Sequence, residues 1–173
     1  MADFPPSTLQ PLVQEVFSLL KSRNETVSIA ETAAGGLISS SLLSVPGASA
    51  IYNGGPTVYT LKSRLIFAGW TPVDKENYRG PTTEIVSQMA DHTRRTLGST
   101  YAVSESGTAG PTGGTTRNRT PGYVAVAVSS PHGRFTREVE TGSNNRGENM
   151  VAFAAEALKL LRDVLAESTA PVL

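Results

Sequence analysis

Residues 26–38 read Thr-Val-Ser-Ile-Ala-Glu-Thr-Ala-Ala-Gly-Gly-Leu-Ile, and this stretch decides the fold. The segment Thr26–Glu31 is short, β-branched and apolar, which is typical of a buried strand. Gly35-Gly36 leads into Leu37 and Ile38, which begin a helix that Pro46-Gly47 ends. The sequence therefore predicts a strand, a tight turn and a helix, the unit from which α/β sheets are built.

Further helices and strands are predicted on both sides of this unit. Before it, apolar residues at helical spacing follow a Ser7-x-x-Gln10 capping box and predict a helix from about Thr8 to Ser22. After it, the same reasoning predicts a strand within 49–60 that Gly54-Gly55-Pro56 interrupts, a helix over 61–67, a helix from Thr82 or Thr83 to 97, and a strand over 101–105.

The C-terminal part closes the pattern with a hairpin and a long helix. Tyr123–Ser130 and Arg134–Thr141 have the composition of strands and flank the turn Pro131-His132-Gly133. A helix from about Arg146 to Glu167 follows, with its apolar residues on one face. This order predicts an α/β fold, a three-layer α/β/α sandwich with a mixed, mostly parallel sheet and a C-terminal β-hairpin plus helix.

The composition excludes several classes of protein. The 173 residues are 39% hydrophobic, which suits one domain over residues 1–173 with its core at about 8–167. The 15 Lys and Arg balance the 15 Asp and Glu, so neither nucleic acid nor a membrane is expected as a partner. The chain has no cysteine, and His92 and His132 lack metal-ligand spacing, so no metal site is expected. No apolar run approaches the ~18 residues that cross a bilayer and Met1–Gln10 has no signal-peptide pattern, so we expect a cytoplasmic protein.

The turn after the first predicted strand is one candidate site, because ligands of layered α/β folds bind beyond the carboxyl ends of the strands. Gly35 and Gly36 let backbone amides approach a ligand, and the helix start favours an anion such as phosphate. Thr32 lies at the same edge, although the turn is equally consistent with Thr32 as a helix cap and the glycines as packing residues. Glu31 would repel a phosphate unless it turns away, so we expect it to organise the loop or orient a water.

The loop that follows the strand at 101–105 is the second candidate. Residues 106–122 contain five glycines, five threonines and two prolines, and so long a loop in a compact domain is usually functional or disordered. It lacks the Gly-Lys-Ser/Thr of a Walker A loop and the spaced glycines of a dinucleotide site, which disfavours an ATPase or a dehydrogenase. Because the loop directly follows a strand, we expect it to form a wall of a pocket and not a flexible surface loop.

Together the two segments resemble the C-terminal domain of the CinA family, the nicotinamide mononucleotide amidohydrolases. The family pattern Ala-Glu-Ser-Cys-Thr-Gly-Gly is similar to Ala30–Gly36, and its Ser-Gly-x-Ala-Gly-Pro-x-Gly-Gly is similar to Ser106–Gly114. Further matches occur in the same order at Ser44–Ala50, Gly54-Gly55, Val58-Tyr59, Gly69, Pro121–Val124 and Arg146. The resemblance extends over about Thr8 to Leu165.

The resemblance implies hydrolysis of the carboxamide of nicotinamide mononucleotide to nicotinic acid mononucleotide and ammonia, a metal-independent step of pyridine nucleotide salvage without a cofactor. In the family the motif serine is the nucleophile, and a tyrosine and a basic residue assist it. These roles fall on Thr32, Tyr59 and Arg64, with Lys62 close by in the sequence. Arginine cannot act as a base, so spacing leaves open whether Lys62 replaces the family's lysine. Threonine keeps the hydroxyl, but its methyl group crowds attack on a carbonyl.

The substrate, a pyridine mononucleotide, is expected to be bound by both loops and by the start of the last helix. Backbone amides of the second loop suit the developing oxyanion or the phosphate, and Arg146 suits a phosphate clamp. The expected substrate-binding residues are Glu31, Gly35, Gly36, Ser106, Gly107, Thr108, Ala109, Gly110 and Arg146.

Two other expectations follow from the resemblance. A homo-oligomer is implied, and no N-terminal pyrophosphatase-type domain, such as larger family members carry, is expected. Because Thr32-Ala33-Ala34 replaces the family's Ser-Cys-Thr, the alternative function is a catalytically impaired nucleotide-binding sensor or interaction protein of the same fold. A purely structural protein would leave the two glycine loops unexplained.

Overall fold

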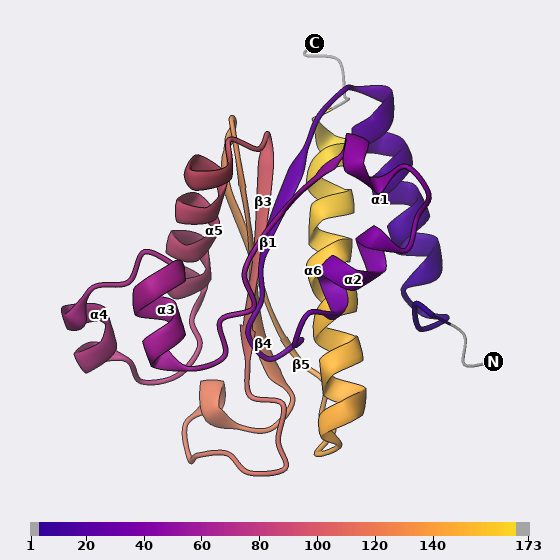
Figure 1. Cartoon of the computed structure of the whole chain (residues 1–173). Coiled ribbons are helices and arrows are strands. Elements are labelled where there is room, and N and C mark those ends of the chain that lie inside the picture. Colours follow the sequence, from indigo (N-terminus) through magenta and orange to yellow (C-terminus); the bar gives the residue numbers. More distant parts are fainter. Residues whose placement is uncertain (1–3, 169–173) are drawn as a thin grey trace.

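The computed structural model describes residues 4–168, in which helices and strands alternate up to residue 61 and then follow one another in groups (Figure 1). The helices are α1 (Gln10–Ser22), α2 (Leu37–Leu43), α3 (Leu61–Phe67), α4 (Pro72–Asn77), α5 (Thr83–Leu97) and α6 (Arg146–Glu167), with short 3-10 turns η1 (Ala48–Ala50) and η2 (Arg117–Arg119). The strands are β1 (Val27–Ala30), β2 (Tyr52–Gly54), β3 (Tyr101–Gly107), β4 (Tyr123–Ser130) and β5 (Gly133–Glu140).

The five strands form one mixed sheet in the order β2-β1-β3-β4-β5. β1 is parallel to β2 and β3, whereas β4 is antiparallel to β3 and β5. The predicted mixed sheet is confirmed, but its antiparallel pairings are as numerous as its parallel ones. The reason is that no helix crosses over between β3 and β4, so the chain returns beside β3 in the opposite direction.

Helices cover both faces of the sheet, which confirms the three-layer sandwich (Figure 1). α5 packs on β1, β3 and β4 from one side, and α6 packs on β3, β4 and β5 from the other, with α1 and α2 against α6. Every residue of β1 and β4 is buried. Burial on both faces explains why these strands read as continuous apolar runs instead of alternating ones.

The edge strands of the sheet differ from the central ones. β2 has only three residues and is followed by Gly55, where an added Cβ would lie 2.7 Å from the Ile29 carbonyl carbon and closer still to its oxygen. The predicted interruption by glycines is thus confirmed, and close packing on β1 is its cause. On β5 at the other edge, Phe135 and Val139 pack toward the core, and Arg137 between them pairs with Glu156 and Asp163 of α6.

Three local features differ from the sequence-based expectations. α1 begins after Leu9 without a side-chain cap, so the predicted Ser7 capping box is wrong; the Gln10 amide instead donates to the Pro5 carbonyl. α4 was not predicted, because none of its residues is buried and it has no apolar period. β3 also continues to Gly107, beyond the predicted end at residue 105, which makes Ser106 and Gly107 strand residues. None of the helices within residues 4–168 combines the length and apolarity required to span a membrane.

Candidate active site

β1 and β3 end side by side, and the residues at these ends form the candidate site. Ala30 pairs with Ser104 in the parallel register, so the turn that follows β1 meets the end of β3 and the loop beyond it. The two glycine-rich segments selected from the sequence therefore lie at the same edge of the sheet, where ligands of layered α/β folds bind.

The Thr32 hydroxyl lies inside this edge. It donates a hydrogen bond to Ser106 Oγ over 3.2 Å, and Thr32 is only 2% exposed while Ser106 is fully buried. The structure thus brings the expected nucleophile and an expected substrate-binding residue into contact. A ligand that reacts at Thr32 has to displace the side chains that cover it.

A carboxylate that the sequence analysis did not select lies against the same turn. Glu105 is fully buried, and its Oε2 accepts hydrogen bonds from the amides of Thr32 and Ala34, each over 3.0 Å. Its Oε1 has no hydrogen-bond partner within residues 4–168. Burial raises the pKa of Glu105 to about 7. The hydrogen bonds that it accepts from the two amides favour the ionised form and oppose this shift.

The strand pattern contains the signal that identifies Glu105. Side chains two residues apart in a strand share a face, so Glu105 lies on the same side of β3 as Tyr101 and Val103. Both of these residues belong to the buried core. A glutamate at a core position of a strand is rare unless it is partnered, which makes it a candidate functional group.

Glu31 organises the turn and has no oxygen left for a substrate. Its two carboxylate oxygens accept hydrogen bonds from the amides of Gly36, Ile38 and Ser39 and from the Ser39 hydroxyl. These amides belong to the start of α2, so a side chain of the protein occupies the place where an anion was expected. The Gly35 amide is also bonded within the turn. Of the roles considered for Glu31, the structure supports loop organisation, and it does not support phosphate binding by Gly35 and Gly36.

Packing and hydrogen bonding reduce the number of loop amides that are open to a ligand. The Thr108 amide donates to the Tyr123 carbonyl, so the expected role of Thr108 as an amide donor is not supported. Gly107 is required by packing, because an added Cβ would lie 2.6 Å from the Phe153 ring. The backbone amides of Ala109 and Gly110 donate no hydrogen bond to any described residue.

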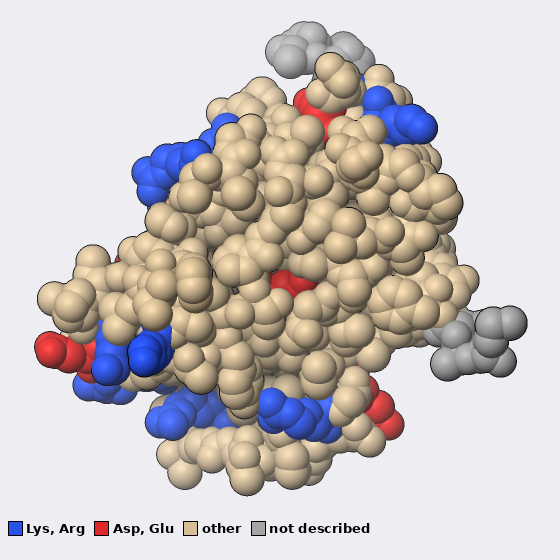
Figure 2. All heavy atoms as spheres, in the orientation of Figure 1, with Lys and Arg blue, Asp and Glu red and all other residues tan. Residues whose placement is uncertain are grey.

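Arg146, the first residue of α6, connects two segments at the rim of the site. Its Nη1 donates to the Gly110 carbonyl over 2.8 Å, and its Nη2 donates to the Tyr59 hydroxyl over 3.0 Å. Both Arg146 and Tyr59 are exposed. The amide of Val58 donates to the Glu31 carbonyl, which places this rim next to the turn after β1. Lys and Arg side chains gather along the lower edge of the face in Figure 2, where the loop after β3 lies.

Arg64, an expected catalytic residue, is part of the packing. It is 5% exposed, and its guanidinium carbon lies 5.1 Å from the ring centres of both Trp70 and Tyr78. Its Nε donates to the Val58 carbonyl over 3.3 Å. Arg64 therefore holds α3 and the residues that flank α4 to the segment after β2. Arg64 makes no hydrogen bond with Thr32, its Nη1 is buried without a hydrogen-bond partner within residues 4–168, and its charge lowers the pKa of Glu105.

Lys62, the other basic candidate, lies exposed on α3 and makes no hydrogen bond or ion pair with the residues that the structure describes. The contacts in the structure bring together Thr32, Ser106 and Glu105 inside the site and Tyr59 and Arg146 at its rim. In the described part of the chain, no three His, Cys, Asp or Glu side chains form a group that could hold a metal ion.

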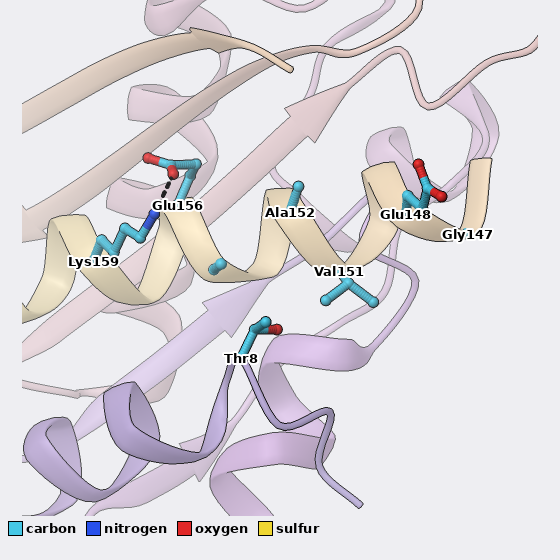
Figure 3. Close-up of a pocket in the computed structure, with 8 residues that line it drawn as sticks. Thr8, Gly147, Glu148, Val151, Ala152, Glu156 and Lys159 are labelled. Atoms are coloured by element: carbon cyan, nitrogen blue, oxygen red, sulfur yellow. Dashed lines mark hydrogen bonds and ion pairs between the residues drawn. The ribbon is translucent and has the colours of Figure 1, made fainter. Parts of the chain in front are cut away.

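A separate hollow of about 660 Å³ lies between the start of α1 and the first half of α6 (Figure 3). Alkyl groups of Val151 and Ala152 line it, and Glu156 and Lys159 form an ion pair of 2.7 Å on its wall. It contains none of the residues of the candidate site and no buried polar side-chain atom without a partner, so we do not assign it a catalytic role.

Comparisons with known proteins give a consistent result. Residues 9–165 match the family model described as the CinA C-terminal domain. A CinA-like protein of Desulfosudis oleivorans is 36% identical over 151 residues, which cover 87% of this chain and 36% of that protein. A CinA-like protein of Shewanella piezotolerans is 32% identical over 151 residues, covering 87% of this chain and 35% of that protein. The chain thus spans about a third of the length of these relatives.

Solved structures with the same fold are also known. A competence/damage inducible protein, CihA, from Agrobacterium tumefaciens superposes with a TM-score of 0.86 at 26% identity, covering 96% of this chain and 99% of that one. A CinA superfamily protein from Klebsiella pneumoniae superposes with a TM-score of 0.85, covering 94% of this chain and 99% of that one. At 19% identity, the second likeness shows the fold alone.

Proposed function

The chain belongs to the CinA C-terminal domain family, and from this premise we propose that it hydrolyses the carboxamide of nicotinamide mononucleotide to nicotinic acid mononucleotide and ammonia. One observation carries the proposal: the hydroxyl of Thr32, at the position of the family's serine, is held inside the carboxyl edge of β1 and β3 by Ser106. Hydroxyl nucleophiles of hydrolases occupy such edges because loops from neighbouring strands converge there.

In this proposal the Thr32 hydroxyl attacks the carboxamide carbon or orients the water that does so. A neutral hydroxyl is a weak nucleophile near neutral pH, so a neighbouring group has to accept its proton during attack. The hydrogen bond to Ser106 Oγ directs that proton to the Ser106 hydroxyl, which passes its own proton to the amide nitrogen so that ammonia leaves. Water then cleaves the ester formed with Thr32, or is itself the nucleophile where Thr32 only orients it. The amides of Ala109 and Gly110 are the donors available to the developing oxyanion.

The rim supplies a site for the phosphate of the mononucleotide. Arg146 presents a guanidinium at the first turn of a helix of 22 residues, where unpaired amides also favour an anion. Its present partners are the Gly110 carbonyl and the Tyr59 hydroxyl, both neutral groups. A phosphate can therefore replace them with charge-assisted hydrogen bonds.

Arg146→Ala is expected to weaken the binding of nicotinamide mononucleotide by about tenfold or more, because a charge-assisted hydrogen bond to phosphate is lost. Binding of nicotinamide riboside, which lacks the phosphate, should change little. Isothermal titration calorimetry measures both dissociation constants. Arg95→Ala, at an exposed arginine of α5, serves as the control for lost charge. An unchanged dissociation constant for the mononucleotide in Arg146→Ala would rule out the clamp.

The reaction itself is tested by incubating the purified wild-type protein with nicotinamide mononucleotide and detecting nicotinic acid mononucleotide by mass spectrometry. Heat-denatured protein is the control. Product that accumulates with time and in proportion to native protein supports the proposed activity. Absence of product at millimolar substrate would contradict it.

A nucleotide-binding protein without hydrolysis is the second candidate function, and one observation favours it. Thr32 is 2% exposed and its hydroxyl is already bonded to Ser106, so it is not poised on an open surface. Saturable binding of the mononucleotide without product is the result that this function predicts.

A further inference from the structure

One oxygen of the Glu105 carboxylate lacks a hydrogen-bond donor. Oε2 accepts the amides of Thr32 and Ala34, whereas Oε1 accepts nothing from residues 4–168, although Glu105 is 0% exposed. A buried carboxylate oxygen without a donor is costly, because burial removes the water that would otherwise bind it. We therefore expect a ligand or a buried water to donate the hydrogen bond that Oε1 lacks.

The position of Glu105 favours a ligand that also reaches Thr32. Glu105 and Ser106 are consecutive in β3, and they bind Thr32 at two points, its amide and its hydroxyl. The amide that Glu105 binds, over 3.0 Å, and the hydroxyl belong to the same residue, so a group that reacts at the Thr32 hydroxyl comes near the Glu105 carboxylate. In nicotinamide mononucleotide this group is a primary carboxamide, whose nitrogen carries two N–H donors.

Building on the proposed function, we infer that Glu105 is a specificity-determining residue, which selects a carboxamide over the corresponding carboxylate because its Oε1 accepts an N–H of the substrate. The amide supplies the donor that this oxygen lacks, and the acid product does not. The product also brings a second negative charge against Glu105, and like charges repel in a buried site. Glu105 thus favours binding of the substrate and release of the product.

This selectivity depends on the charge of Glu105. Burial raises its pKa to about 7; the amides of Ala34 and Thr32 oppose this shift, the charge of Glu31 adds to it and the charge of Arg64 opposes it. Below this pH the carboxyl group carries a proton and can donate a hydrogen bond to the acid product. Above it the ionised carboxylate accepts from the amide and repels the acid. The preference for the amide therefore increases as the pH rises through 7.

Calorimetric titration with nicotinamide mononucleotide and nicotinic acid mononucleotide tests the inference. Thr32→Ala protein is used throughout, because it prevents turnover and keeps the backbone amide that Glu105 binds. The quantity compared is the dissociation constant of the acid divided by that of the amide. This ratio should increase about tenfold between about pH 6 and about pH 8, as expected for one ionisation near pH 7. Ionisation of the phosphate cancels because both ligands carry it.

Two variants isolate the residue responsible. In Thr32→Ala/Glu105→Gln protein the ratio should no longer depend on pH, because the glutamine side chain does not titrate. Thr32→Ala/Glu84→Gln, which removes an exposed glutamate of α5, should retain the full pH dependence. The titrations of Thr32→Ala protein alone keep the inference testable if Glu105→Gln prevents folding.

The inference would be overturned if the ratio of dissociation constants were the same at the two pH values, or if it changed equally in Thr32→Ala/Glu105→Gln protein. A buried water would then be the donor to Oε1. Hydrolysis by the wild-type protein together with a constant ratio would contradict only this inference. A ratio that depends on pH and on Glu105, without hydrolysis, would contradict only the proposed reaction. Failure of both nucleotides to bind would overturn both.

Discussion

Thr32→Ala is expected to reduce the hydrolysis of nicotinamide mononucleotide by about a thousandfold or more, whereas Thr32→Ser preserves or increases it. The alanine removes the hydroxyl that Ser106 holds at the end of β1. The serine keeps that hydroxyl and removes only the methyl group, which restricts the side-chain rotamer and crowds attack on a carbonyl. Initial rates of product formation, followed by mass spectrometry at equal protein concentration, measure both effects.

Thr93→Ala is the matched control for this experiment. Thr93 of α5 is also 2% exposed, and its hydroxyl has no hydrogen-bond partner within residues 4–168. Its removal tests the effect of deleting a buried threonine side chain away from the site, and the rate should stay within about twofold of wild type. Equal rates in wild-type and Thr32→Ala protein, with both folded by circular dichroism, would remove Thr32 from the reaction.

Gly55→Ala is expected to have the largest effect on stability, about 3 kcal/mol or more in the free energy of unfolding. An added Cβ would overlap the carbonyl group of Ile29 and lie 2.9 Å from the Ile29 nitrogen. Because these atoms belong to the backbone of the buried strand β1, they cannot move aside as a flexible side chain would. Thermal unfolding followed by circular dichroism should show a midpoint lowered by about 10 °C.

Gly147→Ala is the control for adding a methyl group to a glycine. Its added Cβ would meet only the Asn145 side chain, at 3.5 Å, which is an ordinary contact. Gly147 lies in the first turn of α6, and alanine is the better helix former, so the unfolding midpoint should rise slightly. A Gly55→Ala protein as stable as wild type would show that β1 and the segment after β2 do not pack as described.

The parts of the fold that could be predicted are those with a clear side-chain period. α6 extends over Arg146–Glu167, as its apolar face predicts, and the hairpin of β4 and β5 follows from two strand-like segments around a short turn. α4 could not be predicted in this way, because it lies on the surface and buries nothing; its local signals were the Thr71 and Asp74 cap pair and Pro72 at its start. Pattern-based prediction detects burial, so an element without a buried face escapes it.

The site was predictable where a motif places residues along one segment, and less so where distant segments meet. Thr32 and Ser106 come from the two glycine-rich segments and are in contact. The stacking of Arg64 could not be predicted, because its aromatic partners, such as Trp70, follow it in the chain without any spacing that marks a stacked cation. Glu105 was missed because a single carboxylate in a sequence usually lies in water, and only the burial of its strand face marks it as different.

Both edges of the sheet are unsuited to pairing with a strand of another molecule. β2 offers only three residues before the chain bends away at its glycines. Arg134, Glu138 and Glu140 are exposed on β5, so a strand added there would lie beside a row of charged side chains. Short or charged edges are a common protection against edge-to-edge aggregation. We therefore expect that concentrated solutions of the native protein do not form fibrils through this sheet, and that shortening or neutralising β5 would remove the protection.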